Sequence, residues 1–109
     1  PVIQSTLGVS AATLTAVRQG LYLVSKTGGD ARIQVGNIKI CAKTGTAETG
    51  TLNVYDTWMV AFAPMDNPTV AVLLMYEDSP YQRSTSMAPL LHDMLQQYFN
   101  LYGGKNGSN

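Results

Sequence analysis

The chain contains 109 residues, with seven basic and seven acidic side chains and a formal net charge of zero. Hydrophobic residues make up 45% of it and charged residues only 13%, well below the usual quarter, so the composition is that of core-rich globular material. The neutral balance argues against a nucleic-acid partner, and the longest apolar run, seven residues at 70–76, is too short to span a bilayer.

The chain begins at Pro1, with neither a methionine nor a signal-peptide pattern. We therefore expect a segment of a longer protein, whose targeting information lies upstream. The low charge also indicates that another polypeptide covers part of its surface.

Ser10 is a good N-cap for a first helix, which Gly28-Gly29 should stop. The apolar positions of this helix recur at helical spacing: Leu14, Val17, Leu21 and Val24. Lys26-Thr27-Gly28 is expected in its last turn, where a lysine near the carbonyl end and a capping glycine serve local structure. We expect no catalytic role for this tripeptide.

A second K-T-G follows residues 35–42, whose β-branched alternation predicts a strand. Lys43, Thr44, Gly45 and Thr46 would then lie together on one sheet edge. An ammonium, two hydroxyls and a flexible glycine are groups suited to bind a carboxylate and a carbonyl. The structural alternative is a solvated edge lysine beside threonines that are ordinary strand formers.

The remaining pattern predicts a loop at 48–56, a hairpin of strands 57–63 and 69–77 with a turn at 64–68, and a final helix. Both strands are apolar at nearly every position, so we expect helices on both faces of the sheet. The final helix would have Ser84 or Ser86 as its cap and Gly103-Gly104 as its end, with residues 103–109 as a disordered tail. Its apolar stripe comprises Met87, Leu90, Leu91, Met94, Leu95, Tyr98, Phe99 and Tyr102.

K-T-G on a strand is one of three motifs found in serine-dependent penicillin-recognising enzymes, beside S-x-x-K and S-x-N. No serine of this chain has a lysine three positions later, and none has an asparagine two positions later. The nucleophile and its base must therefore lie in another polypeptide segment.

From about Ser10 to about Phe99, the chain resembles the C-terminal part of the transpeptidase domain of class B, monofunctional, high-molecular-weight penicillin-binding proteins. The shared features are the helix before a glycine pair, A-K-T-G-T-A-E at 42–48, Trp58 opening the next strand, A-F-A-P at 61–64 and Ala88-Pro89 in the last helix. The resemblance implies an α+β fold, in which an antiparallel sheet of five strands is flanked by helices. This chain would supply the last three strands in the order helix, strand, strand, strand, helix, as a C-terminal segment spanning 1–109.

The resemblance also implies site roles. Lys43 and Thr46 would be catalytic, the lysine lying across the cleft from the serine and the Thr46 N–H forming half of an oxyanion hole. Thr44, Gly45 and Thr46 would bind substrate, the hydroxyls holding its carboxylate and the glycine allowing close backbone approach. One departure from the family is the segment 77–86, which is usually glycine-rich and here contains no glycine.

Other conspicuous residues are interpreted structurally. Trp58 is expected in the sheet core, Glu48 as a solvated carboxylate, His92 on the surface, and the single cysteine, Cys41, as a buried strand residue. With one cysteine and one histidine, we expect no metal site and no cofactor.

Two function classes stay open. The first is a D,D-transpeptidase that cross-links peptidoglycan stem peptides and is acylated by β-lactams, at the extracytoplasmic face of the bacterial cell membrane, in cell shape or cell division. It requires the N-terminal part of the protein as a partner, and the isolated chain would be inactive. The second is a penicillin-sensing or degenerate domain of the same fold, which binds without turnover.

Overall fold

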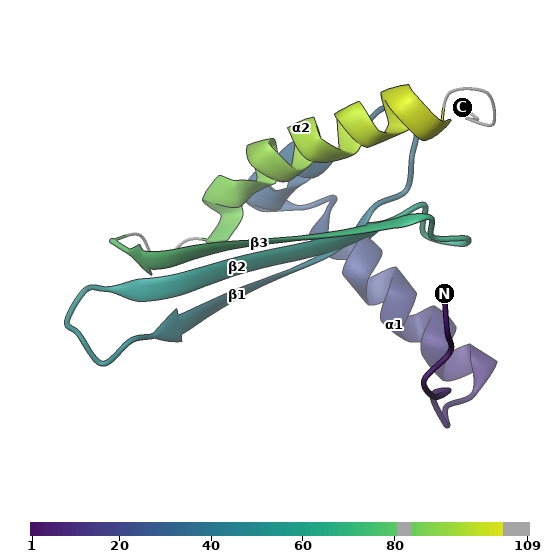
Figure 1. Ribbon diagram of the computed structural model, residues 1–109, viewed down its shortest axis with the longest axis horizontal. Helices are drawn as coiled ribbons and strands as arrows, with labels where there is room; N and C mark the ends of the chain where they lie inside the picture. Colours follow the sequence, from purple (N-terminus) through teal and green to yellow (C-terminus); the bar gives the residue numbers. More distant parts are fainter. Residues whose placement is uncertain (81–83, 104–109) are drawn as a thin grey trace.

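The computed structural model describes residues 1–80 and 84–103 (Figure 1). It confirms the predicted order of one helix, three strands and one helix, and it adds short helical turns between them. In chain order, the elements are α1 (Ala11–Val24), η1 (Gly28–Ile33), β1 (Cys41–Glu48), β2 (Tyr55–Ala63), β3 (Val70–Ser79), η2 (Ser84–Met87), α2 (Ala88–Tyr98) and η3 (Phe99–Gly103). None of the helices within the described ranges has the length and apolar character needed to cross a membrane.

The three strands form an antiparallel sheet in the order β1-β2-β3, so β2 is central. In β1, Lys43 pairs with Val60, Thr44 with Met59 and Gly45 with Trp58. The register of β2 and β3 shifts between Tyr55 and Thr57. Among the described residues, β1 and β3 are therefore the two edges of the sheet.

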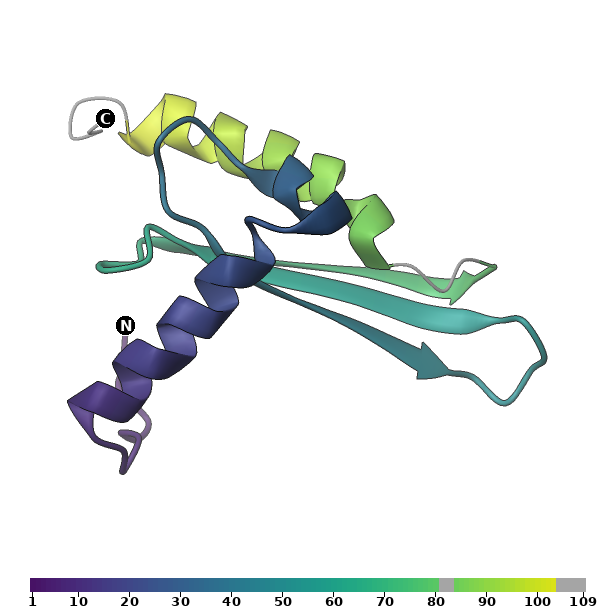
Figure 2. The same cartoon turned by 180° about the vertical axis from the view of Figure 1, so that it is seen from behind.

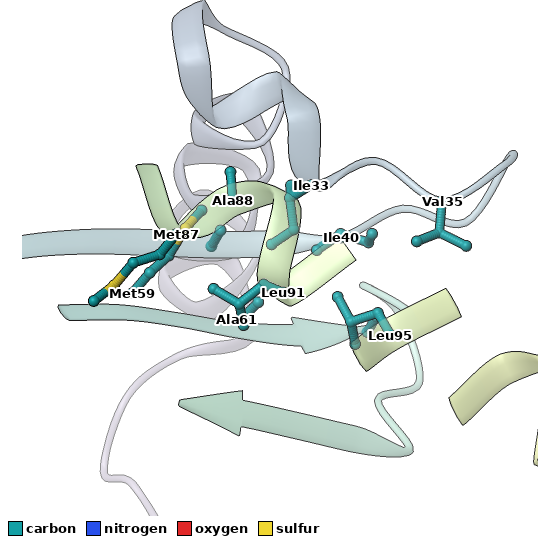
Figure 3. Packing of buried hydrophobic residues seen from close by; sticks show 11 residues of the cluster. Ile33, Val35, Ile40, Met59, Ala61, Met87, Ala88, Leu91 and Leu95 are labelled. Atoms are coloured by element: carbon teal, nitrogen blue, oxygen red, sulfur yellow. The ribbon is translucent and has the colours of Figure 1, made fainter. Parts of the chain in front are cut away.

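Helix α2 covers one face of this sheet, together with η1 (Figures 1 and 2). Figure 3 shows Leu91 and Leu95 of α2 packed toward Met59 and Ala61 of β2. The buried apolar cluster comprises Ile33, Val35, Ile40, Ala42, Met59, Ala61, Ala63, Met87, Ala88, Leu91 and Leu95. Strand β2 contributes the alternate residues Met59, Ala61 and Ala63, as the two-residue period of a strand requires, and β1 contributes Ala42.

The opposite face of the sheet is largely uncovered in this chain. It carries Trp58, Val60, Leu73 and Met75, which are all exposed. Helix α1 lies on this side (Figures 1 and 2) and reaches β1, where the Cys41 thiol lies 3.5 Å from the Arg18 carbonyl oxygen. Helices therefore lie on both sides of the sheet, as predicted, but α1 leaves most of this second face uncovered.

Helix α1 begins as predicted, because the Ser10 hydroxyl accepts a hydrogen bond from the Thr13 N–H at 3.1 Å. It ends earlier than predicted, at Val24, with Ser25 as its C-cap. Gly28, in the left-handed region at φ +54°, begins η1. Lys26-Thr27-Gly28 thus follows the helix and does not form its last turn.

The predicted strand at 35–42 is wrong over most of its length. Val35 and Ile38 form an isolated bridge around a turn in which Gly36 has φ +50°. The alternation in the sequence arises because Val35 and Ile40 are buried in the core, and burial alone gives the same pattern as a strand. The strand begins at Cys41, so the second K-T-G lies inside it and not after its end.

Other boundaries move by a few residues. The loop between β1 and β2 is shorter than predicted, at 49–54, and β3 continues to Ser79. Helix α2 has Met87 as its N-cap, with no side-chain cap bond and with a proline in its first turn, so the predicted serine cap is wrong. Gly103 ends η3, and the rest of the predicted tail lies outside the described residues, as does part of the glycine-free segment.

Ser25 provides a test of how α1 is joined to β1. Its buried hydroxyl lies 2.6 Å from the Ile40 carbonyl oxygen and 2.8 Å from that of Tyr22. Ser25→Ala should lower the free energy of unfolding by about 1–3 kcal/mol, because a buried acceptor loses its donor. Urea unfolding of the domain that contains this chain measures the change.

The neighbouring Lys26→Ala is the control. Its ammonium makes an exposed hydrogen bond of 3.2 Å to Gln34 Oε1, so its loss should change stability by no more than about 0.5 kcal/mol. Equal unfolding midpoints for the two variants would contradict the role assigned to Ser25.

Candidate active-site strand

The second K-T-G lies on an edge strand, as the sequence predicted. One edge of β1 is bonded to β2, and no strand of the described chain pairs with the other edge. Along β1, Lys43 and Gly45 face the same side as Cys41, whereas Thr44 and Thr46 face the α2 side with Ala42. The strand therefore presents an ammonium on one face and two hydroxyls on the other, with backbone donors and acceptors between them.

Lys43 is exposed, and its Nζ donates to the Thr44 carbonyl oxygen at 2.7 Å. An ammonium has three N–H donors, so this bond leaves it able to donate to an incoming acceptor as well. Thr46 is also exposed, whereas Thr44 and Gly45 are half-buried. The predicted site residues are thus together on one strand, and the strand is accessible.

Nothing in the described chain requires residue 45 to be a glycine. A Cβ built at this position would meet only the Trp58 Cβ, at 3.9 Å, which is an ordinary van der Waals contact. Its φ also lies outside the left-handed region that favours glycine. A need for glycine at this position would therefore come from a molecule outside the described chain.

Asp30 of η1 is a half-buried carboxyl that sequence reasoning did not single out. Its Oδ1 is buried and has no hydrogen-bond partner in the described parts of the chain. Burial raises the pKa of the Asp30 carboxyl, and the positive charges of Arg32 and Lys43 partly offset the rise. In the sequence, Gly-Gly-Asp is typical of a turn, and nothing local indicates that one oxygen of this carboxyl becomes buried.

The Arg32 side chain makes its hydrogen bonds to the backbone. Its Nε donates to the Gly29 carbonyl oxygen and its Nη2 to that of Thr85, each at 3.0 Å. The first bond lies within η1, and the second joins η1 to η2, the turn that precedes α2. Asp30 Oδ1 thus stays without a hydrogen-bond partner in the described chain, although the charge of Arg32 lowers the pKa of this carboxyl.

The other residues singled out in the sequence have mixed outcomes. Glu48 is exposed and Cys41 is buried, as predicted, and burial raises the pKa of the Cys41 thiol, offset by Arg18 and reinforced by Asp66. Trp58 is 36% exposed on the uncovered face, so its placement in the core was wrong. His92 is half-buried, with Nδ1 2.7 Å from the Gln34 carbonyl oxygen, so the expected surface histidine was also wrong.

No group of three or more histidine, cysteine, aspartate or glutamate side chains within residues 1–80 and 84–103 could hold a metal ion. Strand β1 itself offers hydrogen bonding and charge, through an ammonium, two hydroxyls and an edge of backbone amides. These groups fit an anionic, peptide-like ligand.

Comparison with known proteins is consistent with this geometry. The sequence profile described as "Penicillin binding protein transpeptidase domain" matches residues 1–96. The peptidoglycan D,D-transpeptidase PbpA of Mycolicibacterium smegmatis is 38% identical over 71 residues, which cover 62% of this chain and 14% of PbpA.

Solved structures agree in fold. The D,D-transpeptidase domain of a peptidoglycan glycosyltransferase from Eggerthella lenta matches with a TM-score of 0.70 and 30% identity, over 87% of this chain and 22% of that chain. Penicillin-binding protein 2B from Streptococcus pneumoniae matches with a TM-score of 0.73 and 26% identity, over 91% of this chain and 17% of that chain. The chain thus spans about a fifth or less of the length of each of these relatives.

The open space around Gly45 leads to a stability prediction. Gly45→Ala should change the free energy of unfolding by less than about 1 kcal/mol, because its backbone conformation and surroundings accept a Cβ. Gly50→Ala, at φ +89° in the following loop, should cost about 1–2 kcal/mol. Urea midpoints of both variants measure the difference, and unfolding of the Gly45 variant would show that the fold itself requires this glycine.

Proposed function

Because the chain belongs to the transpeptidase domain family of the class B penicillin-binding proteins, we propose that it is the K-T-G sheet segment of a serine D,D-transpeptidase. The observation that carries the proposal is the placement of A-K-T-G-T-A-E on the accessible edge strand β1. The serine and its activating lysine belong to the part of the protein that precedes this segment. The substrates are peptidoglycan stem peptides, and β-lactams acylate the same serine.

The reaction is acyl transfer through an ester. The serine Oγ attacks the carbonyl carbon of the penultimate D-alanine, the peptide bond to the terminal D-alanine breaks, and the departing amine takes a proton. An amine of a second stem peptide then attacks the ester, forms the cross-link and returns the serine hydroxyl. β-Lactams enter the same first step, and their opened ring stays attached to the serine.

The residues of β1 have separate parts in this chemistry. The Lys43 ammonium attracts the terminal carboxylate and supports proton transfer near the serine. The hydroxyls of Thr44 and Thr46 donate to that carboxylate. The Thr46 N–H supplies one donor of the oxyanion hole, and such a donor typically contributes about 3 kcal/mol to lowering the barrier.

The edge of β1 also sets the orientation of the substrate. A stem peptide that lies antiparallel to β1 adds a strand to the sheet, and backbone hydrogen bonds then hold its acyl group. A glycine at position 45 lets the substrate backbone approach β1 closely. Within the described chain, a Cβ at this position would meet only the Trp58 Cβ, so a bound substrate is the reason for a glycine here.

The uncovered face of the sheet supports the preceding part of the protein as a partner. Trp58, Val60, Leu73 and Met75 form an exposed apolar surface, and β3 is an edge strand of ten residues. Surfaces of this kind invite association with another polypeptide.

We propose that the domain acts at the extracytoplasmic face of the bacterial membrane, where peptidoglycan is cross-linked, in the synthesis that supports cell shape or division.

The two K-T-G sequences provide an internal control for the proposal. In the complete protein, Lys43→Ala should reduce acylation by a fluorescent penicillin by orders of magnitude, because the site loses the charge that faces the serine and the carboxylate. The fold should survive, since Lys43 is exposed. Rates of labelling, with circular dichroism of each variant, measure both effects.

Lys26→Ala removes the lysine of the other K-T-G, which follows α1 and makes an exposed hydrogen bond to Gln34. Its acylation rate should stay within about twofold of the wild-type rate. Wild-type acylation of the Lys43 variant would refute the assigned role. Acylation without turnover of an acyl-D-Ala-D-Ala analogue would instead favour a penicillin sensor of the same fold.

A further prediction concerns the isolated chain. It should not react covalently with a fluorescent penicillin, because no serine in it has a lysine at the required spacing. When it is combined with the preceding part of the protein, the label should appear on that other polypeptide. Gel fluorescence with mass spectrometry locates the label, and a labelled serine in this 109-residue chain would contradict the proposal.

A further inference from the structure

We propose that Glu48, the last residue of β1, forms a charge-selective subsite for the stem peptide. The subsite takes the substrate residue that lies two positions before the penultimate D-alanine. It favours a cationic side chain at that position and disfavours an acidic one. The inference rests on the proposed function, in which the stem peptide lies antiparallel to β1, and it adds a specificity-determining residue to the K-T-G strand.

The register of the added strand follows from the oxyanion hole. In the proposed reaction, the Thr46 N–H donates to the carbonyl oxygen of the penultimate D-alanine, so these two residues form a hydrogen-bonded pair. Such pairs recur at every second residue of an antiparallel ladder, in which the two chains run in opposite directions. The next pair therefore joins Glu48 to the residue two positions before the penultimate D-alanine, with the Cα atoms about 5.5 Å apart.

Strand β1 remains regular as far as this position. It pairs with β2 without interruption from Cys41 to Glu48, which lies opposite Tyr55. The chain then turns away, because the Thr49 hydroxyl donates to the Val54 carbonyl oxygen at 2.9 Å and closes the loop toward β2. Glu48 is thus the last position of β1 that can form a hydrogen-bonded pair with a ligand.

The Glu48 carboxylate is available to a ligand. The side chain is exposed, and it makes no hydrogen bond or ion pair within the described residues. The Glu48 end of β1 projects beyond the first turn of α2 (Figures 1 and 2), so this helix does not cover it. Residues directly opposite each other in an antiparallel pair have their side chains on the same face and close together. A substrate side chain at this position would therefore lie beside the carboxylate.

The consequence is selection by charge. A lysine side chain opposite Glu48 gains an exposed ion pair, a neutral side chain gains none, and a carboxylate is repelled. One residue nearer to the terminal D-alanine, a substrate side chain would lie opposite Ala47, on the face of the sheet that carries Lys43. The preference for a positive charge is therefore specific to the position opposite Glu48.

The test compares N-acetylated tetrapeptides of the form Xaa-Ala-D-Ala-D-Ala, in which Xaa is lysine, glutamine or glutamate. The complete protein should release the terminal D-alanine with a kcat/KM about threefold higher for the lysine peptide than for the glutamine peptide, the effect of one exposed ion pair. For the glutamate peptide, kcat/KM should be about threefold lower than for the glutamine peptide. High salt should reduce both ratios.

Charge variants of Glu48 separate an electrostatic role from a structural one. Glu48→Gln should remove the preference among the peptides, and Glu48→Lys should reverse it, so that the glutamate peptide becomes the best substrate. Glu77→Gln removes an exposed carboxylate from β3, at the other edge of the sheet, and should keep the wild-type order. A purely structural role for Glu48 would change all the rates by the same factor and leave the order as it was, which would overturn the inference.

A binding measurement keeps this inference separate from the proposed reaction. Calorimetric titration of the same peptides into the complete protein, with its nucleophilic serine replaced by alanine, requires no acylation. The lysine peptide should bind about threefold more tightly than the glutamine peptide, and Glu48→Gln should make the two dissociation constants equal. Equal binding of the peptides when Glu48 is present would overturn the subsite even if the peptides are turned over. Selective binding without acylation of the serine by a penicillin would overturn the proposed reaction alone.

Discussion

Burial of Ala42, Met59 and Ala61 beneath Leu91 and Leu95 decides which way every side chain of β1 points. Because strand side chains alternate, a slip of one residue in the register would move Lys43 under α2 and expose Ala42. That slip would bury a charge and lose apolar contacts, so the core specifies the register strongly. Packing of Ala42, Met59 and Ala61 under α2 thus determines that Lys43 faces one side of the sheet and that the two threonines face the other.

The hydrophobic contacts of α2 also explain how an edge strand stays in place when only one of its edges is bonded. Burying a side chain of the size of leucine contributes about 1.5–3 kcal/mol, which exceeds the net contribution of a typical backbone hydrogen bond. Ala42, Ala61 and Ala63 are small enough to let the helix lie close to the sheet. Strand β1 can therefore leave its outer edge to a ligand without losing its position.

The sequence contained enough information for the element order, the hairpin strands, the α1 cap and the edge position of Lys43. These features depend on local sequence pattern and on the order of motifs, and both can be identified from the sequence alone. The start of β1 was misread because burial of Val35 and Ile40 gives the same alternation as a strand. Asp30, Trp58 and His92 were missed or misplaced because their surroundings come from elements far away in the sequence, which no local pattern records.

The two K-T-G tripeptides show why position within the fold, and not composition, determines what a motif can do. Thr27 has its hydroxyl within hydrogen-bond distance of the carbonyl oxygens of Leu23 and Val24, so it closes the end of a helix. Thr44 has the same neighbours in sequence but lies in an extended strand paired with Met59. In an edge strand, the N–H and C=O groups of alternate residues point outward, whereas at a helix end the amides are turned back on the chain. Only the extended tripeptide can offer a ligand its side chains and its backbone at once.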